Sequence, residues 1–353
     1  MKKVTIQDIA DAMGISRNTV SKAINNSDGL ADSTREKILQ KAIEMGYKQF
    51  SYFRTISSVS DSVVRPHLPN RFQGEIAILT AAFLTQSHFA STMLDKLQQE
   101  LSQLGYTMTL HRVTEENLQH MALPFSFQRD RVNAVICIEM FNYAYDEMVC
   151  GLGLPVLFVD CPPKLDGRSL PADQLFMDNT TEIMRFVHDM IRLGKRRIGF
   201  IGDYKHCHSF FERYCAFINA MAIANAPVEE DFCILRSTID EEVVEHLANL
   251  KELPDVFICA NDFIAFDTIR ALIAIDKRVP EDVLILGFDD SPESRITPAP
   301  LSTIHIHTQA MAFSAVQLLM TRINEPSLDY RIVHTHTDIV LRESTAICDE
   351  RSN

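Results

Sequence analysis

Four polar side chains near the N-terminus have the types and spacing needed to read DNA. Arg17, Asn18, Ser21 and Lys22 recur at i, i+1, i+4 and i+5, so a helix would present them on one face. Arginine can donate two hydrogen bonds to guanine and asparagine can pair with adenine, whereas serine and lysine suit phosphate or a flexible base contact. Such a face could enter a major groove. It would also fit the solvated face of a protein-binding module.

The surrounding sequence predicts three short helices within residues 1–56. Thr5 begins a pattern resembling a capping box, and the apolar stripe that follows it ends at Gly14. Ser16 can cap a second helix, which ends in a run rich in turn-forming residues. A second capping pattern at residues 33–36 would open a third helix. Three helices with a tight turn between the first two predict a helix-turn-helix.

Charge distinguishes this head from the rest of the chain. Residues 1–56 contain nine Lys/Arg and six Asp/Glu, a net charge of +3, whereas the remainder contains 25 basic and 41 acidic residues, a net charge of −16. The overall charge of −13 alone would argue against nucleic-acid binding. A basic head on an acidic body can nevertheless approach phosphate at one end.

Composition is typical of a globular protein in a reducing compartment. The 353 residues exceed one ordinary domain, and the 46% hydrophobic content is enough for a core, so we expect two or three units. The eight cysteines form no C-x-x-C pair and most lie in apolar runs, which predicts reduced thiols. No apolar run reaches the ~18 residues of a membrane span, and no signal peptide precedes the head. We therefore expect a cytoplasmic protein with no membrane partner.

From Glu75 onward, short β-rich runs alternate with helical patterns in two successive series. Strands separated by helices predict parallel sheets covered on both faces. The predicted fold class is therefore an α/β core of two doubly wound subdomains behind an all-α head. Ligands bind at the carboxyl ends of strands in such sheets, which predicts a binding cleft between the subdomains.

The sequence does not contain the motifs that would indicate catalysis or a cofactor. No G-x-G-x-x-G, G-x-x-x-x-G-K-[ST] or G-x-S-x-G pattern occurs, so we expect neither an enzyme nor a cofactor. Histidines pair at His305 and His307, at His334 and His336, and at His206 and His208. Because acidic or thiolate partners at ligand spacing are missing, we expect ordinary histidines and no metal.

The head resembles that of the lactose-repressor/purine-repressor (LacI/GalR) family of transcriptional regulators, in the runs 4–10, 14–25 and 34–47. The resemblance continues through the body in the segments 176–179, 193–202, 260–262, 279–290 and 341–345. It therefore covers nearly the whole chain apart from the linker. It implies a core similar to periplasmic sugar-binding proteins.

The resemblance also implies DNA contacts for individual residues of the head. Arg17 and Asn18, and more weakly Lys22, fall where the family reads bases. Ile56 stands about where the family places a leucine that wedges into the minor groove, although packing within the linker is an equal alternative. The full set of expected DNA-contacting residues is Thr5, Ser16, Arg17, Asn18, Thr19, Ser21, Lys22, Asn25 and Ile56.

The linker over residues 57–74 departs from the family. The Ala-Arg-x-Leu hinge pattern that the family has after Tyr47 is already missing from residues 48–56. The stretch to Gly74 is about a dozen residues longer than in the family, and a longer tether weakens mechanical coupling between domains. The core over residues 75–347 would divide into subdomains of about 75–174 plus 304–333, and 175–303 plus 334–347. Three chain crossings would then form the hinge.

Five side chains are expected to contact an effector. Four that we expect at strand ends match family positions with this role, namely Asp160, Arg213, Asn261 and Asp289, and Phe89 stands near the place of an aromatic that lies over the ligand in the family. Carboxylates accept from neighbouring hydroxyl groups and a guanidinium donates parallel hydrogen bonds, which suits a polyol. Strand-end turns or an ion pair between the subdomains are the alternatives. Phe89 is the weakest of the five, because the aromatic pattern that surrounds this position in the family is absent.

These observations predict a homodimeric regulator that binds a palindromic operator and responds to a small polar effector, with a sugar favoured. Repression is commoner than activation in the family, and an activator role stays open. The sequence also leaves open whether the effector acts as an inducer or as a co-repressor. The alternative is a sugar-binding or sugar-processing protein whose head binds protein rather than DNA.

Overall fold

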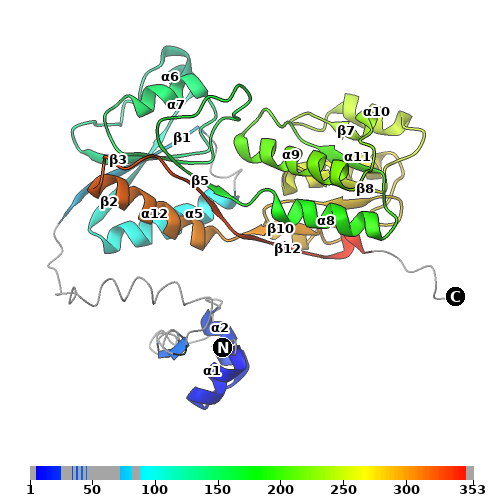
Figure 1. The fold of residues 1–353 in the computed structure, drawn as a ribbon, viewed down its shortest axis with the longest axis horizontal. Coiled ribbons are helices and arrows are strands. Elements are labelled where there is room, and N and C mark those ends of the chain that lie inside the picture. The colour runs from blue at the N-terminus through cyan, green and yellow to red at the C-terminus, as the bar shows by residue number, and fades with distance from the viewer. Residues whose placement is uncertain are drawn as a thin grey trace. The chain divides into compact units, whose positions relative to one another are not determined.

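The computed structural model describes residues 5–24, the separate residues 34, 37, 38, 41, 42 and 45, and residues 72–81 and 88–346. The chain divides into two compact units, Met1–Arg71 and Phe72–Asn353, each of which is described by itself (Figure 1).

The first unit contains the predicted helix-turn-helix. Helices α1 (Ile6–Met13) and α2 (Arg17–Ile24) are separated by Gly14, whose φ of 65° gives the left-handed conformation that ends α1. The capping box of α1 is present: the Thr5 hydroxyl accepts from the Asp8 N–H, and the Asp8 carboxylate accepts from the Thr5 N–H at 2.8 Å. The helices enclose a small apolar core of Ile9, Ala10, Val20, Ala23, Ile38 and Ala42.

The second unit begins with a six-stranded parallel sheet in the order β11-β5-β4-β3-β1-β2. Its strands are β1 (Gly74–Thr80), β2 (Tyr106–Arg112), β3 (Val132–Ile138), β4 (Val156–Val159), β5 (Asp173–Met177) and β11 (Ile332–Thr335). We call the part built on this sheet the N-subdomain.

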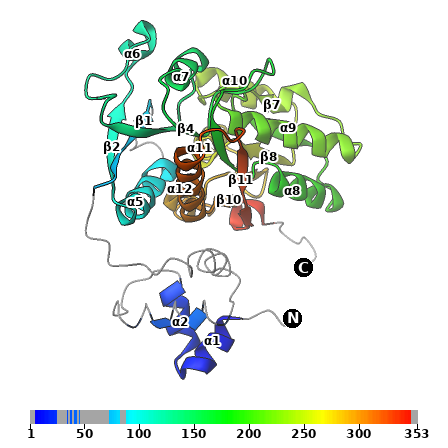
Figure 2. The same cartoon turned by 60° about the vertical axis from the view of Figure 1, so that its left-hand side comes forward.

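Helices cover both faces of this sheet. Ile76 and Ile78, which are alternate residues of β1, pack in one apolar cluster with residues of α5 (His88–Gln103) and α12 (Thr308–Asn324). These two helices lie side by side in Figures 1 and 2. Ala77 and Leu79 point the other way, into the cluster with α7 (Tyr143–Cys150). The short α6 (Glu115–His120) follows β2.

The second sheet has four parallel strands in the order β7-β6-β8-β9, and we call the part built on it the C-subdomain. Its strands are β6 (Ile198–Ile201), β7 (Cys233–Ile234), β8 (Val256–Cys259) and β9 (Leu284–Leu286). Its helices are α8 (Thr181–Arg192), α9 (His208–Ile223), α10 (Glu241–Asn249) and α11 (Asp262–Ala274), with single 3-10 turns at Glu230–Phe232, Pro292–Arg295 and Glu343–Thr345. The two doubly wound sheets confirm the predicted fold class.

The chain crosses between the subdomains three times, after β5, after β10 (Thr303–Ile306) and between β11 and β12 (Thr337–Val340). Strands β10 and β12 form an antiparallel pair, and bridges from β10 and its flank reach the C-subdomain at Leu286 and Asp289. The strands before the crossings end at residues 177, 306 and 335, two or three residues later than the sequence analysis placed the boundaries. Strand pairing continues across the predicted boundaries and accounts for the difference.

None of the helices within the described residues is long and apolar enough to cross a membrane. The seven cysteines in these residues are all free thiols.

The carboxyl group of Asp146, a residue of α7, is buried among apolar side chains. Asp146 is 0% exposed, and neither of its oxygens has a hydrogen-bond partner within the described residues. Burial raises the pKa of Asp146 to about 8, because a carboxylate loses its hydration in an apolar environment. The group therefore remains protonated in neutral solution.

Asp146→Asn should remove a pH-dependent loss of stability. The folded pKa of about 8 lies above the unfolded value near 3.9, so the carboxyl favours folding fully below pH ~4 and loses that contribution as the pH rises towards 8. The loss amounts to about 1.4 kcal/mol for each pH unit in this window. Urea unfolding at several pH values measures it, and the exposed Asp130→Asn controls for the lost charge. A difference between wild type and Asp146→Asn that stays constant with pH would contradict the prediction.

Candidate functional site

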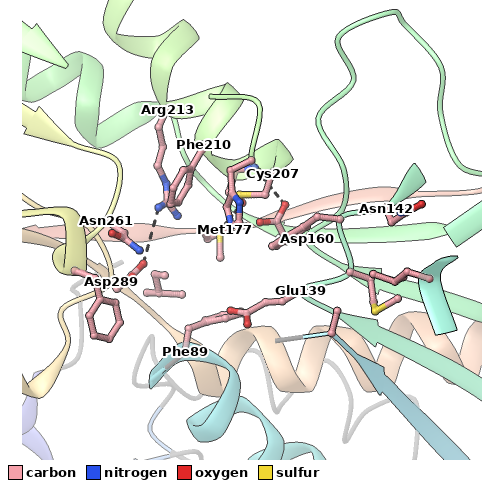
Figure 3. A pocket seen from close by; sticks show the side chains of 18 of the residues that line it. Phe89, Glu139, Asn142, Asp160, Met177, Cys207, Phe210, Arg213, Asn261 and Asp289 are labelled. Carbon is pink, nitrogen blue, oxygen red and sulfur yellow. Dashed lines mark hydrogen bonds and ion pairs between the residues drawn. The ribbon is translucent and has the colours of Figure 1, made fainter. Parts of the chain in front are cut away.

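A cavity of about 590 Å³ lies between the subdomains of the core. Figure 3 shows side chains entering it from strand ends of both sheets. Glu139 follows β3 and Asp160 follows β4 in the N-subdomain, whereas Asn261 follows β8 and Asp289 follows β9 in the C-subdomain. The carboxyl ends of parallel strands thus converge on this cavity, as the sequence analysis expected.

Arg213 is the most constrained charged group of the cavity. It projects from α9, is 2% exposed, and donates from Nε to the Asn179 side-chain oxygen at 2.9 Å and from Nη1 to the Ala260 carbonyl at 2.6 Å. The ring of Phe288 lies 3.4 Å from the guanidinium carbon, which is a close cation–π contact. Burial lowers the pKa of Arg213, although nearby carboxylates such as Asp289 oppose this shift. The guanidinium is therefore held by contacts within the protein itself.

Asp289 faces Arg213, with Oδ1 3.9 Å from Nη1 (Figure 3). Its backbone has a φ of 119°, a conformation that side-chain-bearing residues rarely adopt. Burial raises the pKa of Asp289 well above its usual range; Arg213 opposes this shift, and the neighbouring Asp262 and Glu139 add to it. A carboxyl group held in this way can donate as well as accept a hydrogen bond.

Asp160 contributes to the cavity wall and also bridges the subdomains. Its Oδ1 accepts from the backbone N–H groups of Cys161 at 2.9 Å and Ser209 at 3.2 Å. Because Ser209 lies on α9, this carboxylate links the end of β4 to the helix that carries Arg213. The bond across the subdomains is thus a hydrogen bond from a backbone N–H group and not the ion pair considered as an alternative, and contact with an effector stays a prediction.

Asn261 is the N-cap of α11, where its side-chain oxygen accepts from the Ile264 N–H at 2.9 Å. Its amide group lies beside Asp289 in the cavity (Figure 3). Phe89, buried on α5, forms part of the opposite wall. The structure therefore brings all five predicted effector-binding residues to one cavity, and their contact with an effector stays a prediction.

Several further residues of the wall were not predicted. Glu139 could have been found, because it directly follows a predicted strand and strand ends were the guide elsewhere. Phe210 lies one turn before Arg213 on α9, and the ring of His206 packs against it at 5.4 Å. Burial lowers the pKa of His206. Within the described residues no cluster of His, Cys, Asp or Glu is placed to hold a metal ion.

The head presents the predicted DNA-binding face on α2. Arg17, Asn18 and Lys22 are exposed, whereas Thr19 and Ser21 are half-buried. Ser16 caps the helix by accepting from the Thr19 N–H at 3.1 Å, and Thr5 caps α1 as described above. The remaining two expected contacts, Asn25 and Ile56, lie outside the described residues.

Two doubly wound subdomains around a polar cleft define a periplasmic-binding-protein-like core, and residues 187–345 match the family model described as "Periplasmic binding protein-like domain". Residues 5–49 match the model described as "Bacterial regulatory proteins, lacI family". The chain therefore carries a lacI-family regulatory region followed by a periplasmic-binding-protein-like core, the two parts that its resemblance to the LacI/GalR family implied.

Curated relatives match along nearly the full length. The chain is similar to the HTH-type transcriptional repressor PurR of Pasteurella multocida (strain Pm70), with 26% identity over 347 residues that cover 96% of this chain and 98% of the relative. It is also similar to the HTH-type transcriptional regulator GalR of Lacticaseibacillus casei, with 26% identity over 355 residues, or 97% and 99% of the two chains. These relatives are regulators, so the prediction of a DNA-binding transcriptional regulator rather than an enzyme is confirmed.

Solved structures share the fold. A complex of the transcriptional regulator CelR with cellobiose matches with a TM-score of 0.67 and 21% identity, covering 97% of this chain and 100% of that chain. The lac repressor dimer bound to operator and the anti-inducer ONPF matches with a TM-score of 0.62 and 17% identity, covering 98% and 100%.

Asn261 has a capping role that can be separated from its place in the cavity. Asn261→Ala should lower the free energy of unfolding by about 1 kcal/mol, because the first turn of α11 loses its acceptor. Asn261→Asp keeps an oxygen acceptor but replaces the amide group, so it should retain most of that stability. Urea unfolding of both variants tests this, and an equal loss of stability in both would show that capping is not the structural role of Asn261.

Proposed function

We propose that the protein is a homodimeric transcriptional repressor, whose heads bind a palindromic operator under the control of an unphosphorylated sugar bound in the cleft. The convergence of the five expected effector-binding side chains on one cavity carries the proposal. A dimer is inferred because a single short recognition helix reads too few base pairs for specificity. Within this proposal, residues 1–56 form the head, 57–74 the linker and 75–347 the sensing core of a cytoplasmic protein.

The charges of the cavity favour a neutral or cationic polyol. Among the described residues, four acidic side chains and a single arginine line it, namely Glu115, Glu139, Asp160 and Asp289 with Arg213. Because burial raises the pKa of Asp289, the negative charge is assigned to the other three. This excess of negative charge would repel a phosphate group, whereas the carboxylates can accept hydrogen bonds from sugar hydroxyls. Phe89 and Phe210 offer apolar surface for the C–H face of a sugar ring. The cellobiose complex of the structural relative CelR supports the same class, and the purine repressors among the curated relatives make purines the alternative.

Substitution of the recognition helix should abolish specific DNA binding. Arg17→Ala combined with Asn18→Ala removes two side chains that would hydrogen-bond to bases. Each such pairing contributes about 1–3 kcal/mol, so we expect operator affinity to fall more than tenfold. The operator would first be selected from random duplexes with the wild-type protein, and affinity would then be measured by fluorescence anisotropy at several salt concentrations.

Arg270→Ala is a matched control, because it removes one exposed arginine from the core. It should leave operator affinity unchanged. If the double variant binds the selected duplex as tightly as wild type, the recognition-helix assignment is wrong, and a head that binds protein becomes the better interpretation.

A thermal-shift panel should identify the effector class. At about 100 times its dissociation constant a ligand stabilises by about 2.7 kcal/mol, which raises Tm by several degrees. The panel consists of D-glucose, D-galactose, D-ribose, cellobiose, glucose 6-phosphate and hypoxanthine. We expect an unphosphorylated sugar to shift the wild type but not Asp289→Ala, with Asp130→Ala as the control outside the cavity. A shift from hypoxanthine or the phosphate ester alone would overturn the sugar assignment and leave the repressor proposal standing.

A further inference from the structure

A hydrogen-bonded cluster around Glu212 lies beside the cavity without lining it. Glu212 immediately precedes Arg213 on α9. One of its oxygens, Oε2, accepts from the Asn179 side-chain amide at 2.8 Å. The other, Oε1, lies 3.1 Å from Nε2 of His334 and 3.4 Å from Nε2 of His208. A single carboxylate is thus surrounded by three polar side chains.

Two of these partners belong to the segments that connect the subdomains, whereas His208 lies on α9 itself. Asn179 lies in the first crossing, directly after β5, and His334 lies on β11, which leads into the third crossing. Glu212 itself belongs to α9 of the C-subdomain. Two of the three crossings are therefore attached to the helix that carries the cavity arginine, so a relative rotation of the subdomains would change the geometry of this cluster.

Asn179 connects the cluster directly to Arg213. It is 1% exposed; its amide nitrogen donates to Glu212, and its oxygen accepts from Arg213 Nε at 2.9 Å. A carboxylate can only accept and a guanidinium can only donate, so this pair of partners permits one orientation of the amide. The charge on Glu212 thereby orients the oxygen that holds Arg213.

The two histidines pack against the same aromatic ring. Phe176 stacks on His334 with ring centroids 5.3 Å apart and contacts His208 at 4.9 Å. The charged groups that face His334 are Glu212, Asp178 and Lys164.

The charge state of the cluster follows from these contacts. The hydrogen bond to Glu212 raises the pKa of His334 above its ordinary value, although burial opposes this shift. Burial by itself would raise the pKa of Glu212, but hydrogen bonds from His208, His334 and Asn179 hold it well below its usual range. Glu212 therefore stays ionised, whereas His334 gains and loses its proton at a pH above the ordinary range for histidine.

We propose that Glu212 is a positioning residue for the effector site, which orients Arg213 through Asn179 and couples that orientation to the subdomain crossing through His334. The hydrogen bond between His334 and Glu212 is stronger when His334 is protonated and weaker when His334 is neutral. The position of Arg213 therefore depends on pH and on the relative placement of the subdomains. This inference rests on the proposed function, because it assumes that Arg213 contacts the effector.

The side-chain Nε–H signal of Arg213 in the ¹⁵N NMR spectrum of the full-length protein tests the proposal without any ligand. The signal is assigned by its loss in Arg213→Lys. In wild type we expect its chemical shift to follow pH with a midpoint above 6.5, the ordinary value for histidine. In His334→Gln this titration should disappear, and in Glu212→Gln the signal should move to a new, pH-independent position.

His307→Gln is the matched control, because His307 also pairs with a carboxylate at the crossings, Asp338 at 2.9 Å, but has no bond to Asn179 or Glu212. Its spectrum should titrate as wild type does. His334 is partly exposed, so its variant should fold, and urea unfolding checks this.

A titration of the Arg213 signal that survives in His334→Gln, or a signal that Glu212→Gln leaves in place, would overturn the proposal. No sugar is present in this experiment, so its failure is distinct from a failure of the thermal-shift panel to find an effector.

Discussion

The burial of the Arg213 guanidinium is the constraint on which the arrangement of the cleft depends. A charge removed from water is tolerated only where hydrogen bonds and opposite charge replace its hydration. For Arg213 the replacements come from several separate elements: the first crossing at Asn179, the end of β8 at Ala260, and the end of β9 at Phe288 and Asp289. These strand ends must therefore be held in register, which a doubly wound parallel sheet achieves through its backbone ladders.

The buried carboxylate of Asp262 supports the segment that carries Asp289. Asp262, at the first turn of α11, accepts from the Thr303 hydroxyl at 2.6 Å and from the Ser291 N–H at 2.8 Å, and so holds both sides of the loop after β9. The approach is so close that a Cβ atom at Gly287 would lie 2.2 Å from an Asp262 oxygen, which explains glycine at that position. The unusual backbone conformation of Asp289 is thus supported by hydrogen bonds within the protein on both sides of its loop.

The sequence was sufficient where the signal is local. The Thr5 capping box, the left-handed Gly14 and the alternation of strands and helices each depend on residues a few positions apart, and the structure contains all three. Asp289 was found because the family resemblance and the strand-end rule selected the same position. Arg213 was also expected at a strand end, but it lies on α9, so the resemblance alone selected it.

Long-range pairings could not be predicted in this way. Glu212 lies 33 residues from Asn179 and 122 residues from His334, and no periodicity connects them. The paired histidines were expected to have no acidic partners, because none stands at ligand spacing in the sequence. The fold supplies such partners from elsewhere: Glu212 for His334, and Asp338 for His307. The expectation of ordinary, metal-free histidines was therefore based on an incomplete premise, since their carboxylate partners come from distant segments.

The contacts that span the subdomains indicate how a cleft ligand can act at a distance. An effector shifts an equilibrium between two arrangements only by as much as it binds one better than the other. Asp160 joins β4 to α9 through Ser209, and Glu212 joins α9 to β11 through His334, so both cross the cleft and both adjoin Arg213 or its helix. A ligand that engages Arg213 and Asp160 together would therefore favour the arrangement in which these bridges are intact. The preference between subdomain arrangements is thus set by the same few hydrogen bonds that shape the cavity.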